Sequence, residues 1–268
     1  MAQGMGLFGI GLLLDQSGND SYLVQILGQG LGMTSGLGQL MDFRGNDQYL
    51  SRSELPTNYG TPGIMDSWVQ GVGLGLREIS AGGVGVLVDL EGRDTYEAMS
   101  FAQGGGYHHG LGVFLDGGEG NDSYLGARYN FGWGAHAGLG YFKEFGGDDL
   151  YHTRQIVAAG LAWDRSLALF HDQAGDDIYE LGDFSLAATA HHSIAVFLDS
   201  AGADHYRGVQ PAGSAKGPVN LSVFMDLGHE QDDFDAIDAE SGCTLVDPFG
   251  YLILLPSTRD LLPDECRH

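Results

Sequence analysis

Short apolar runs recur along the chain, and each of them ends at a carboxylate. Aligned on that residue, the first acidic column comprises Asp15, Asp42, Asp89, Asp116, Glu144, Asp172, Asp199 and Asp226, with intervals of 27, 47, 27, 28, 28, 27 and 27 residues. Eight copies at a nearly fixed period are typical of a repeat architecture, in which each copy forms one structural unit.

The apolar positions within each run predict a β-strand. The fifth residue before the carboxylate is aliphatic in every copy, the second is Leu or Phe, and the sixth and fourth are small. A helix is disfavoured because two glycines in one run would each cost about 1 kcal/mol relative to alanine, and because no 3.6-residue stripe persists. Short runs rich in Val, Ile and Phe between Gly/Asp turns are typical of strands.

The predicted fold is therefore all-β, a parallel β-helix (β-solenoid) of about eight coils of 27–28 residues. Such a coil suits three short strands and three corners, and like residues of successive coils would stack about 4.8 Å apart. Residues 1–235 form the predicted solenoid, and 236–268 a C-terminal strand and cap. The interval of 47 residues contains two predicted insertions, within 50–69 and within 72–82.

Both faces of the strand before the carboxylate are apolar, which normally means that both faces are covered. This pattern predicts packing against a second copy or another layer; the alternative is that a face rich in glycine tolerates exposure. Residues 2–4 (AQG) match residues 102–104, so the chain begins in mid-coil. Because an open solenoid end is a bare strand edge, we expect a homo-oligomer or the continuation of a longer chain.

Charge narrows the classes of partner. The chain has 12 basic and 36 acidic residues, with a formal net charge of −24. No basic stripe is available to bind phosphates, so we expect no nucleic-acid partner, whereas a hard divalent cation suits the excess of carboxylates. No apolar run is long enough to span a membrane. The two cysteines, Cys243 and Cys266, predict either one bridge that closes the cap or two free thiols.

A second carboxylate follows the first after five or six residues, and an aromatic residue follows two positions later. The second acidic column comprises Asp20, Asp47, Asp94, Asp122, Asp149, Asp177, Asp204 and Asp232. In the fourth coil the turn reads GGEGNDSYL (117–125), which resembles the calcium-binding nonapeptide of RTX β-rolls, with Tyr124 in the place of an aliphatic residue. The resemblance implies a right-handed parallel β structure with calcium between stacked turns, although RTX motifs recur every nine residues and this one occurs once per coil.

Two interpretations of the acidic turns remain open. In the first, the turns bind Ca²⁺, because carboxylates stacked at about 4.8 Å repel one another by roughly 1 kcal/mol per pair and need a counter-ion. In the second, the first Asp of each turn only caps the amides of its own turn. The predicted calcium ligands are Asp15, Asp20, Asp42, Asp47, Asp89, Asp94, Asp116, Asp122, Asp172 and Asp177. The aromatic column is expected to be a stacked ladder rather than a ligand set.

One corner does not repeat like residues. Eight positions before the carboxylate, four consecutive coils have His108, His136, Asp164 and His191, and the insertion around Arg77 and Glu78 enters at the same corner. The candidate catalytic residues are these four with Arg128 and Arg165; the candidate ligand-binding residues are Tyr107, His109, Tyr129, Trp163 and His192. Such a cluster is consistent with a transition-metal site, with an acid, a base and sugar-stacking rings, or with an ordinary solvated corner.

The sequence thus predicts an extracytoplasmic solenoid (secreted, periplasmic or cell-surface) that binds calcium at its acidic turns and a ligand, such as a glycan, at the His/Asp corner. A second hypothesis is a β-helix enzyme that acts on a polysaccharide as a lyase or hydrolase, an analogy of architecture alone. A third is a purely structural or adhesin segment.

Overall fold

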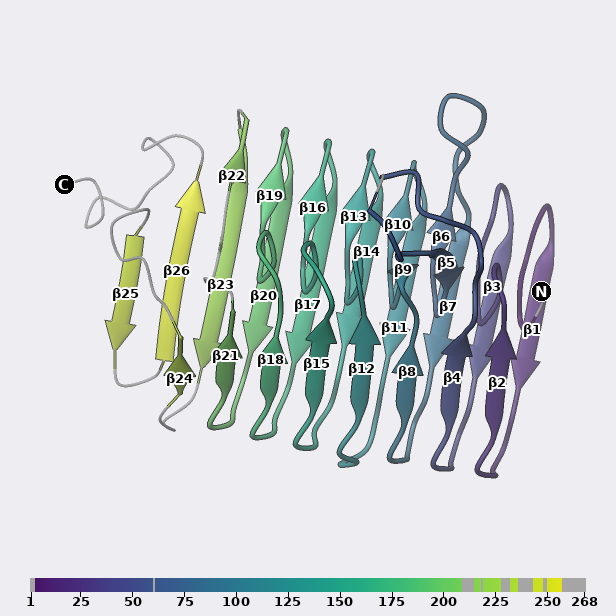
Figure 1. The fold of residues 1–268 in the computed structure, drawn as a ribbon, viewed down its shortest axis with the longest axis horizontal. Helices are drawn as coiled ribbons and strands as arrows, with labels where there is room; N and C mark the ends of the chain where they lie inside the picture. Colours follow the sequence, from purple (N-terminus) through teal and green to yellow (C-terminus); the bar gives the residue numbers. More distant parts are fainter. Residues whose placement is uncertain are drawn as a thin grey trace.

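The protein folds as a parallel β-solenoid, as the repeat predicted (Figure 1). The computed structural model describes residues 3–59, 61–208, 215–217, 219–227, 232–235, 243–247 and 250–256. These residues contain strands and turns but no helix, and hence no helix that could cross a membrane. The all-β prediction of about eight coils is confirmed.

Three sheets run along the solenoid, and each coil contributes one strand to each of the two larger ones, whereas the six-stranded sheet begins at the third coil. The ten-stranded sheet contains β1 (Ile10–Leu14), β3 (Leu37–Met41), β7 (Val84–Val88), β11 (Leu111–Leu115), β14 (Leu139–Lys143), β17 (Leu167–Asp172), β20 (Ile194–Asp199) and β23 (Leu221–Leu227), followed by β26 (Gly250–Pro256) and β25 (Cys243–Asp247). The first eight strands pair in parallel, and β26 pairs antiparallel with β23 and β25. The edge of the last coil is therefore covered by β26.

The eight-stranded sheet follows the acidic turns. It contains β2 (Ser21–Val24), β4 (Gln48–Ser51), β8 (Thr95–Glu97), β12 (Ser123–Gly126), β15 (Leu150–Thr153), β18 (Ile178–Glu180), β21 (His205–Arg207) and β24 (Asp233–Phe234). The six-stranded sheet contains β6 (Gly73–Leu74), β10 (Gly106–Tyr107), β13 (Gly134–Ala135), β16 (Ala162–Trp163), β19 (Thr189–Ala190) and β22 (Ala215–Lys216). A fourth sheet is the pair β5 (Asp66–Val69) and β9 (Ser100–Ala102).

Aromatic rings fill the interior in two columns. Tyr22, Tyr49, Tyr96, Tyr124, Tyr151, Tyr179, Tyr206 and Phe234 stack with ring centroids 4.5–5.2 Å apart. Phe114, Phe142, Phe170, Phe197 and Phe224 stack at 4.7–5.0 Å and meet the first column edge to face. The ladder expected from the sequence is therefore present. Each ring packs on the equivalent ring of the next coil, and this holds the coils in register.

Small residues of the ten-stranded sheet face inward, against the backbone of the six-stranded sheet. At Gly85 in β7, an added Cβ would lie 2.0 Å from the carbonyl oxygen of Val72. The glycines therefore permit a close approach of two sheets rather than making an exposed face tolerable. The larger side chains at alternate positions of these strands point outward instead.

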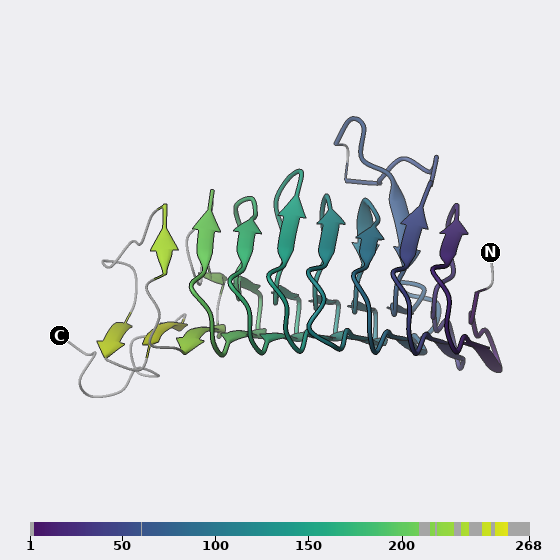
Figure 2. The same cartoon turned by 90° about the horizontal axis from the view of Figure 1, so that it is seen from below.

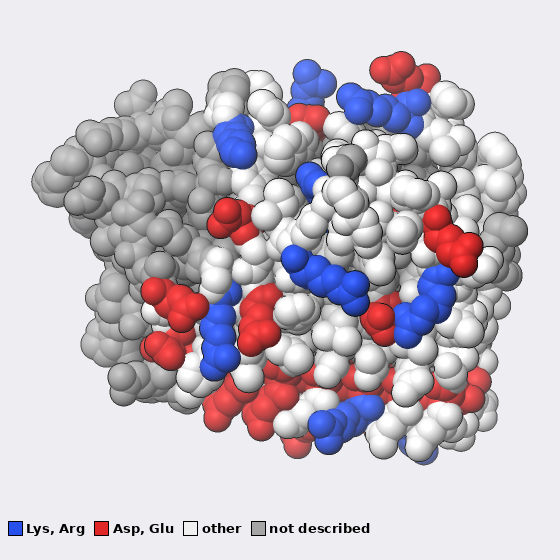
Figure 3. All heavy atoms as spheres, viewed as in Figure 1, with Lys and Arg blue, Asp and Glu red and all other residues white. Residues whose placement is uncertain are grey.

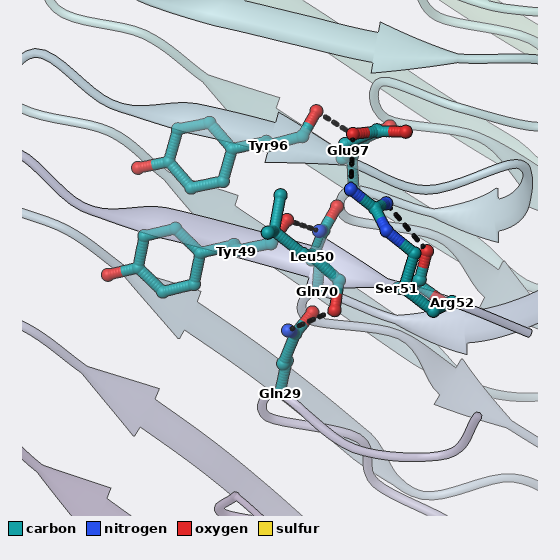
Figure 4. A network of polar contacts seen from close by, with 9 residues as sticks. Gln29, Tyr49, Leu50, Ser51, Arg52, Gln70, Tyr96 and Glu97 are labelled. Carbon is teal, nitrogen blue, oxygen red and sulfur yellow. Dashed lines mark hydrogen bonds and ion pairs between the residues drawn. The ribbon is translucent and has the colours of Figure 1, made fainter. Parts of the chain in front are cut away.

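Glutamine side chains that precede the six-stranded sheet donate hydrogen bonds to the tyrosine strands of the eight-stranded sheet (Figure 4). Gln70 Nε2 donates to the carbonyl oxygen of Tyr49 at 2.8 Å, and Gln103 Nε2 donates to that of Tyr96 at 3.3 Å. On the outer side of the same strands, Arg52 and Glu97 form an ion pair at 2.9 Å. The glutamines thus give buried side-chain amides a backbone partner inside the solenoid.

The two insertions depart from the coil outline (Figures 1 and 2). Residues 52–65 form an excursion between β4 and β5, held by an antiparallel bridge between Pro56 and Met65. Residues 75–82 form a small hairpin with a bridge between Leu76 and Ser80, and this hairpin projects beyond the neighbouring turns. Both insertions lie beside the corner that contains the histidines.

Candidate functional site

The acidic turns form a continuous row between the ten-stranded and eight-stranded sheets. From the second coil onward, thirteen described carboxylates of the two columns are at most 2% exposed: Asp42, Asp47, Asp89, Asp94, Asp116, Asp122, Glu144, Asp149, Asp172, Asp177, Asp199, Asp204 and Asp226. Figure 3 shows a band of acidic side chains along one edge of the molecule. Exposed carboxylates in the acidic turns include Glu91, Glu119, Asp148 and Asp176. We call the buried set the acidic row.

In the second column, one oxygen of each carboxylate closes the turn of the preceding coil. Oδ1 of Asp94 accepts the backbone N–H of Asp47 at 2.5 Å, and Oδ1 of Asp149 accepts that of Asp122 at 2.6 Å. The same bond joins every described pair of neighbouring coils, from Asp20 to Asp232. The second-column carboxylates therefore cap the turns of the preceding coil rather than their own turns.

In the first column, one oxygen of most carboxylates accepts a tyrosine hydroxyl. Tyr49 donates to Asp89 at 2.6 Å and Tyr179 donates to Asp199 at 2.6 Å, so the donor belongs to the coil before the acceptor. Own-turn caps also occur, because Oδ1 of Asp42 accepts the N–H of Arg44 at 3.0 Å. The cap interpretation therefore accounts for only part of the hydrogen bonding in this column.

The remaining oxygens are buried and have no partner. They include Oδ2 of the second-column residues Asp47, Asp94, Asp122, Asp149, Asp177 and Asp204, and Oδ1 of the first-column residues Asp116, Asp172 and Asp199. Carboxylates of adjacent coils meet in triads whose oxygens lie within 4.8 Å of one another, as in Asp42, Asp47 and Asp89, or Asp149, Asp172 and Asp177. Leaving such atoms unpartnered costs free energy, so the arrangement calls for a proton or a cation between them.

Burial raises the pKa of the carboxyl groups with an unpartnered oxygen above the usual value near 4. The pKa of Asp89 is about 6, that of Asp94 about 8 and that of Asp149 about 9, with neighbouring carboxylates adding to the effect of desolvation. The pKa of Glu144 rises to about 12. Among the described residues, no Lys, Arg or His forms an ion pair with the row between Asp42 and Asp204. The row therefore lacks basic residues to balance its charge.

Most of the predicted calcium ligands lie in the acidic row, and Asp15 and Asp20 form a triad with Asp42 at its N-terminal end. Of the ten predicted calcium ligands, eight are buried members, whereas Asp15 and Asp20 at the N-terminal coil are partly exposed. The other five members of the row, Glu144, Asp149, Asp199, Asp204 and Asp226, were not among the predicted ligands, yet they occupy the same columns and are equally buried. The repeat contained the signal, because these five residues stand at the same repeat positions as the predicted ligands.

The His/Asp corner forms a polar groove of about 410 Å³ across four coils. It is lined by Arg77, Glu78, His108, His109, His136, Ala137, Asp164, Arg165, His191 and His192, and we call it the histidine groove. In each coil the two lining residues form a tight turn between the six-stranded and ten-stranded sheets, with φ between 46° and 64° at all eight positions. Side chains in this left-handed region are strained relative to glycine, which these turns would otherwise favour.

Within the groove, His136 Nδ1 lies 2.8 Å from Asp164 Oδ2. His108 Nε2 accepts the backbone N–H of Glu78 at 2.8 Å, so the insertion hairpin fixes the tautomer of this imidazole. Burial and the charge of Arg77 lower the pKa of His136, although Asp164 opposes the shift. A neutral imidazole held by a carboxylate is able to accept a proton or to donate a hydrogen bond to a ligand.

An aromatic pocket of about 360 Å³ adjoins the groove. It is lined by Asn58, Tyr59, Asp66, Trp68, Arg77, Phe101 and Tyr107, so Arg77 borders both spaces. Trp68 stacks on Phe101 with centroids 4.0 Å apart, and Tyr59 is 42% exposed. The sequence did not select Arg77, Tyr59 or Trp68, because all three lie in or beside the insertions, where no repeat column exists for comparison.

The other predicted residues are divided between the groove and its surroundings. The structure brings together His108, His109, His136, Asp164, Arg165, His191 and His192 in the groove, with Tyr107 in the aromatic pocket. Trp163 contacts His191 edge to face at 5.8 Å. Arg128 lies outside the groove, over the ring of Tyr59 at 4.7 Å. Tyr129 is only 4% exposed and stacks on Phe101, so it belongs to the core.

The predicted bridge between Cys243 and Cys266 lies outside the side chains that the structure describes. Comparisons of the chain with protein-family models, with curated proteins and with solved structures give no match. The acidic row and the histidine groove are therefore interpreted from their own geometry.

Proposed function

We propose that the protein is a calcium-binding β-solenoid in which the acidic row holds one divalent cation per coil. The observation that carries the proposal is the set of buried, unpartnered carboxylate oxygens that meet in triads within 4.8 Å. Each coil contributes two carboxylates to the row, so one divalent cation per coil balances their charge without any basic residue. We also propose an extracytoplasmic location, where millimolar calcium suffices for sites of modest affinity.

The ligand atoms favour calcium over other cations. The described triads of the row, such as Asp42, Asp47 and Asp89, consist of carboxylates, which are hard oxygen ligands. Calcium–oxygen distances are about 2.3–2.6 Å, so two ligands on opposite sides of the ion lie up to about 5 Å apart. Magnesium binds at about 2.1 Å and requires a tighter set. The first- and second-column residues would therefore hold calcium in preference to magnesium or zinc.

Removal of calcium tests the proposal. A ligand that binds only the native state stabilises it, so calcium is expected to raise the melting temperature progressively with concentration, and EDTA is expected to reverse the rise. Equilibrium dialysis with calcium alone should reveal several ions per chain, with weaker or no binding of magnesium. Equal melting curves in calcium and in EDTA, or fewer than two bound ions, would contradict the proposal.

Asp149→Asn separates calcium binding from simple turn capping. The side-chain amide oxygen that this substitution introduces can still accept the N–H of Asp122, whereas the charge that a cation needs is removed. We expect the calcium-free variant to be as stable as the parent protein or more stable, and the calcium-dependent rise in melting temperature to be smaller. Asp148→Asn, at an exposed neighbouring position, serves as the matched control and should leave that rise unchanged.

A further inference from the structure

The histidine groove differs in charge from the rest of the molecule. It contains two arginines and five imidazoles against two carboxylates, in a chain with 12 basic and 36 acidic residues. One of those carboxylates, Asp164, is paired with His136. Neither Arg77 nor Arg165 forms an ion pair with a residue that the structure describes. With neutral imidazoles the two arginines and two carboxylates of the groove balance in charge, but both guanidinium groups lack an ion-pair partner among the described residues and can therefore pair with an anionic ligand.

The aromatic pocket adds a second kind of contact at one end of the groove. Tyr59, Trp68 and Tyr107 are each partly exposed there, and Arg77 connects the pocket to the imidazoles. The C–H faces of a pyranose ring pack on such aromatic faces, whereas its hydroxyl groups need hydrogen-bonding side chains such as Asn58 and Asp66 beside them. A small inorganic anion would make no use of the rings.

We propose that the histidine groove and the aromatic pocket together bind an acidic saccharide. A sugar ring stacks in the aromatic pocket, and a carboxylate or sulfate group of the saccharide is bound by Arg77 with His108 and His136. The four turns of the groove follow one another along the solenoid, so the site suits an oligosaccharide that extends past Asp164 to Arg165. This site uses none of the residues of the acidic row, so its test is independent of the calcium proposal.

Titration calorimetry with defined oligosaccharides tests the proposal, at one fixed calcium concentration in all arms. The probes are uronate trimers to hexamers, sulfated oligosaccharides of similar length, and neutral cello-oligosaccharides. We expect one of the acidic series to bind at least tenfold more tightly than the neutral one, and to lose affinity as salt is added. The two acidic series distinguish a carboxylate from a sulfate ligand. Equal binding of neutral and acidic probes, or no binding of either, would overturn the proposal.

Variants locate the site. Arg77→Gln is expected to weaken binding about tenfold or more, and Tyr59→Ala to weaken it independently because it removes the ring but no charge. Arg93→Gln, an exposed arginine of the acidic turns, is the matched control and should bind as the parent does. Binding that persists unchanged in both Arg77→Gln and Tyr59→Ala, with melting curves showing intact folding, refutes the assignment.

The outward face of the ten-stranded sheet supports a second inference from a separate observation. Three positions on each of the eight parallel strands point outward, in columns that begin at Ile10, Leu12 and Leu14. Twenty of these 24 positions are Ile, Leu, Val or Met; the others are Gln39, Tyr141, Lys143 and His171. All but Val88 are partly or fully exposed. An apolar face of this extent is unusual for a monomer.

We infer that a second copy of this chain covers the face. Stable interfaces involve about 20–30 residues on each side, which corresponds to the outward positions available here. The face has almost no charge to match in an unlike partner, since Lys143 Nζ turns aside to Gln173 at 2.8 Å and lies over Phe145. Two identical sheets can pack face to face about a two-fold axis, with the columns of one between those of the other.

Sedimentation analysis of the parent chain tests this inference. A dimer is expected at micromolar concentration, and Leu169→Glu, at the centre of the face, should convert it to a monomer that still unfolds cooperatively, with a melting temperature that no longer depends on protein concentration. Leu23→Glu, an exposed leucine of the eight-stranded sheet, is the control and should remain dimeric. A parent chain that stays monomeric well above micromolar concentration, or a dimeric Leu169→Glu, would disprove the inference.

Discussion

Glu144 is one methylene group longer than the Asp at the same position in the other coils, and this difference changes the tyrosine hydrogen bonds of two coils. In most coils a tyrosine hydroxyl donates to the first-column carboxylate of the next coil, as Tyr49 donates to Asp89. Tyr124 instead donates to Asp116 in its own coil at 2.7 Å, because the next coil has the longer Glu144. Asp116 is then no longer the partner of Tyr96, whose buried hydroxyl has none in the structure.

Two tyrosine substitutions should consequently differ in effect although both remove one hydroxyl from the same ladder. Tyr49→Phe leaves Asp89 without its donor, and we expect the free energy of unfolding to fall by about 1–3 kcal/mol. Tyr96→Phe removes a hydroxyl without a partner, so we expect no loss of stability or a small gain. Denaturant titration of both variants measures the difference, and equal losses would show that the hydroxyl of Tyr96 is hydrogen-bonded.

The tyrosine and carboxylate columns could be predicted from the sequence, but the hydrogen-bond partner of each side chain could not. Repeat spacing places Asp89 and Tyr49 in the sequence, and stacking follows from the period alone. Which carboxylate a hydroxyl reaches depends on the stagger between coils, and this stagger is a property of the three-dimensional turn. Arg77 and Tyr59 escaped prediction for a different reason, since each belongs to an insertion that occurs once.

At the scale of elements, long strands were predictable and short ones were not. The strands from β1 to β23 of the ten-stranded sheet have a repeated apolar pattern of period two, which the sequence expresses eight times. The strands of the six-stranded sheet are two residues long and consist mainly of Gly and Ala, so no pattern of side chains marks them. The sequence marks the six-stranded sheet only indirectly, through residues such as Gly85, whose missing side chain leaves space for the neighbouring backbone.

The outward apolar columns also belong to this scale. Their presence was read from the sequence as a sign of cover on both faces, and the structure assigns the two faces different roles. Glycine and alanine face the six-stranded sheet inside, whereas leucine and valine face outward. A second copy is therefore the cover that we propose for the outer face, and close backbone packing is the cover of the inner one.

For the molecule as a whole, the acidic row determines how stability depends on pH. The folded chain binds protons at Asp89, Asp94 and Asp149 with pKa values of about 6, 8 and 9, whereas the unfolded chain releases them near pH 4. Because the native state binds more protons, the free energy of unfolding of the calcium-free protein must fall as pH rises. The loss begins above about pH 4 and continues through these folded pKa values.

We therefore expect the calcium-free protein to be more stable at pH 5 than at pH 7, and least stable at pH 9. Calcium competes with these protons, so its stabilising effect should be larger at pH 8 than at pH 6. Denaturant titration at each pH, in EDTA and in calcium, measures both trends. Calcium-free stability that increases between pH 5 and pH 9 would show that the row is ionised in the absence of metal.

In the histidine groove, the residues of the two-residue turns can change without changing the fold of the solenoid. Leu111, Leu139, Leu167 and Ile194 follow these turns in unbroken register, whichever residues the turns contain. Exchange of one turn, or duplication of one unit of 27 residues, would rewrite part of the groove while the aromatic columns continue to stack. Such a solenoid could acquire new ligands one coil at a time, and a designer could assemble its recognition surface from interchangeable pairs of residues.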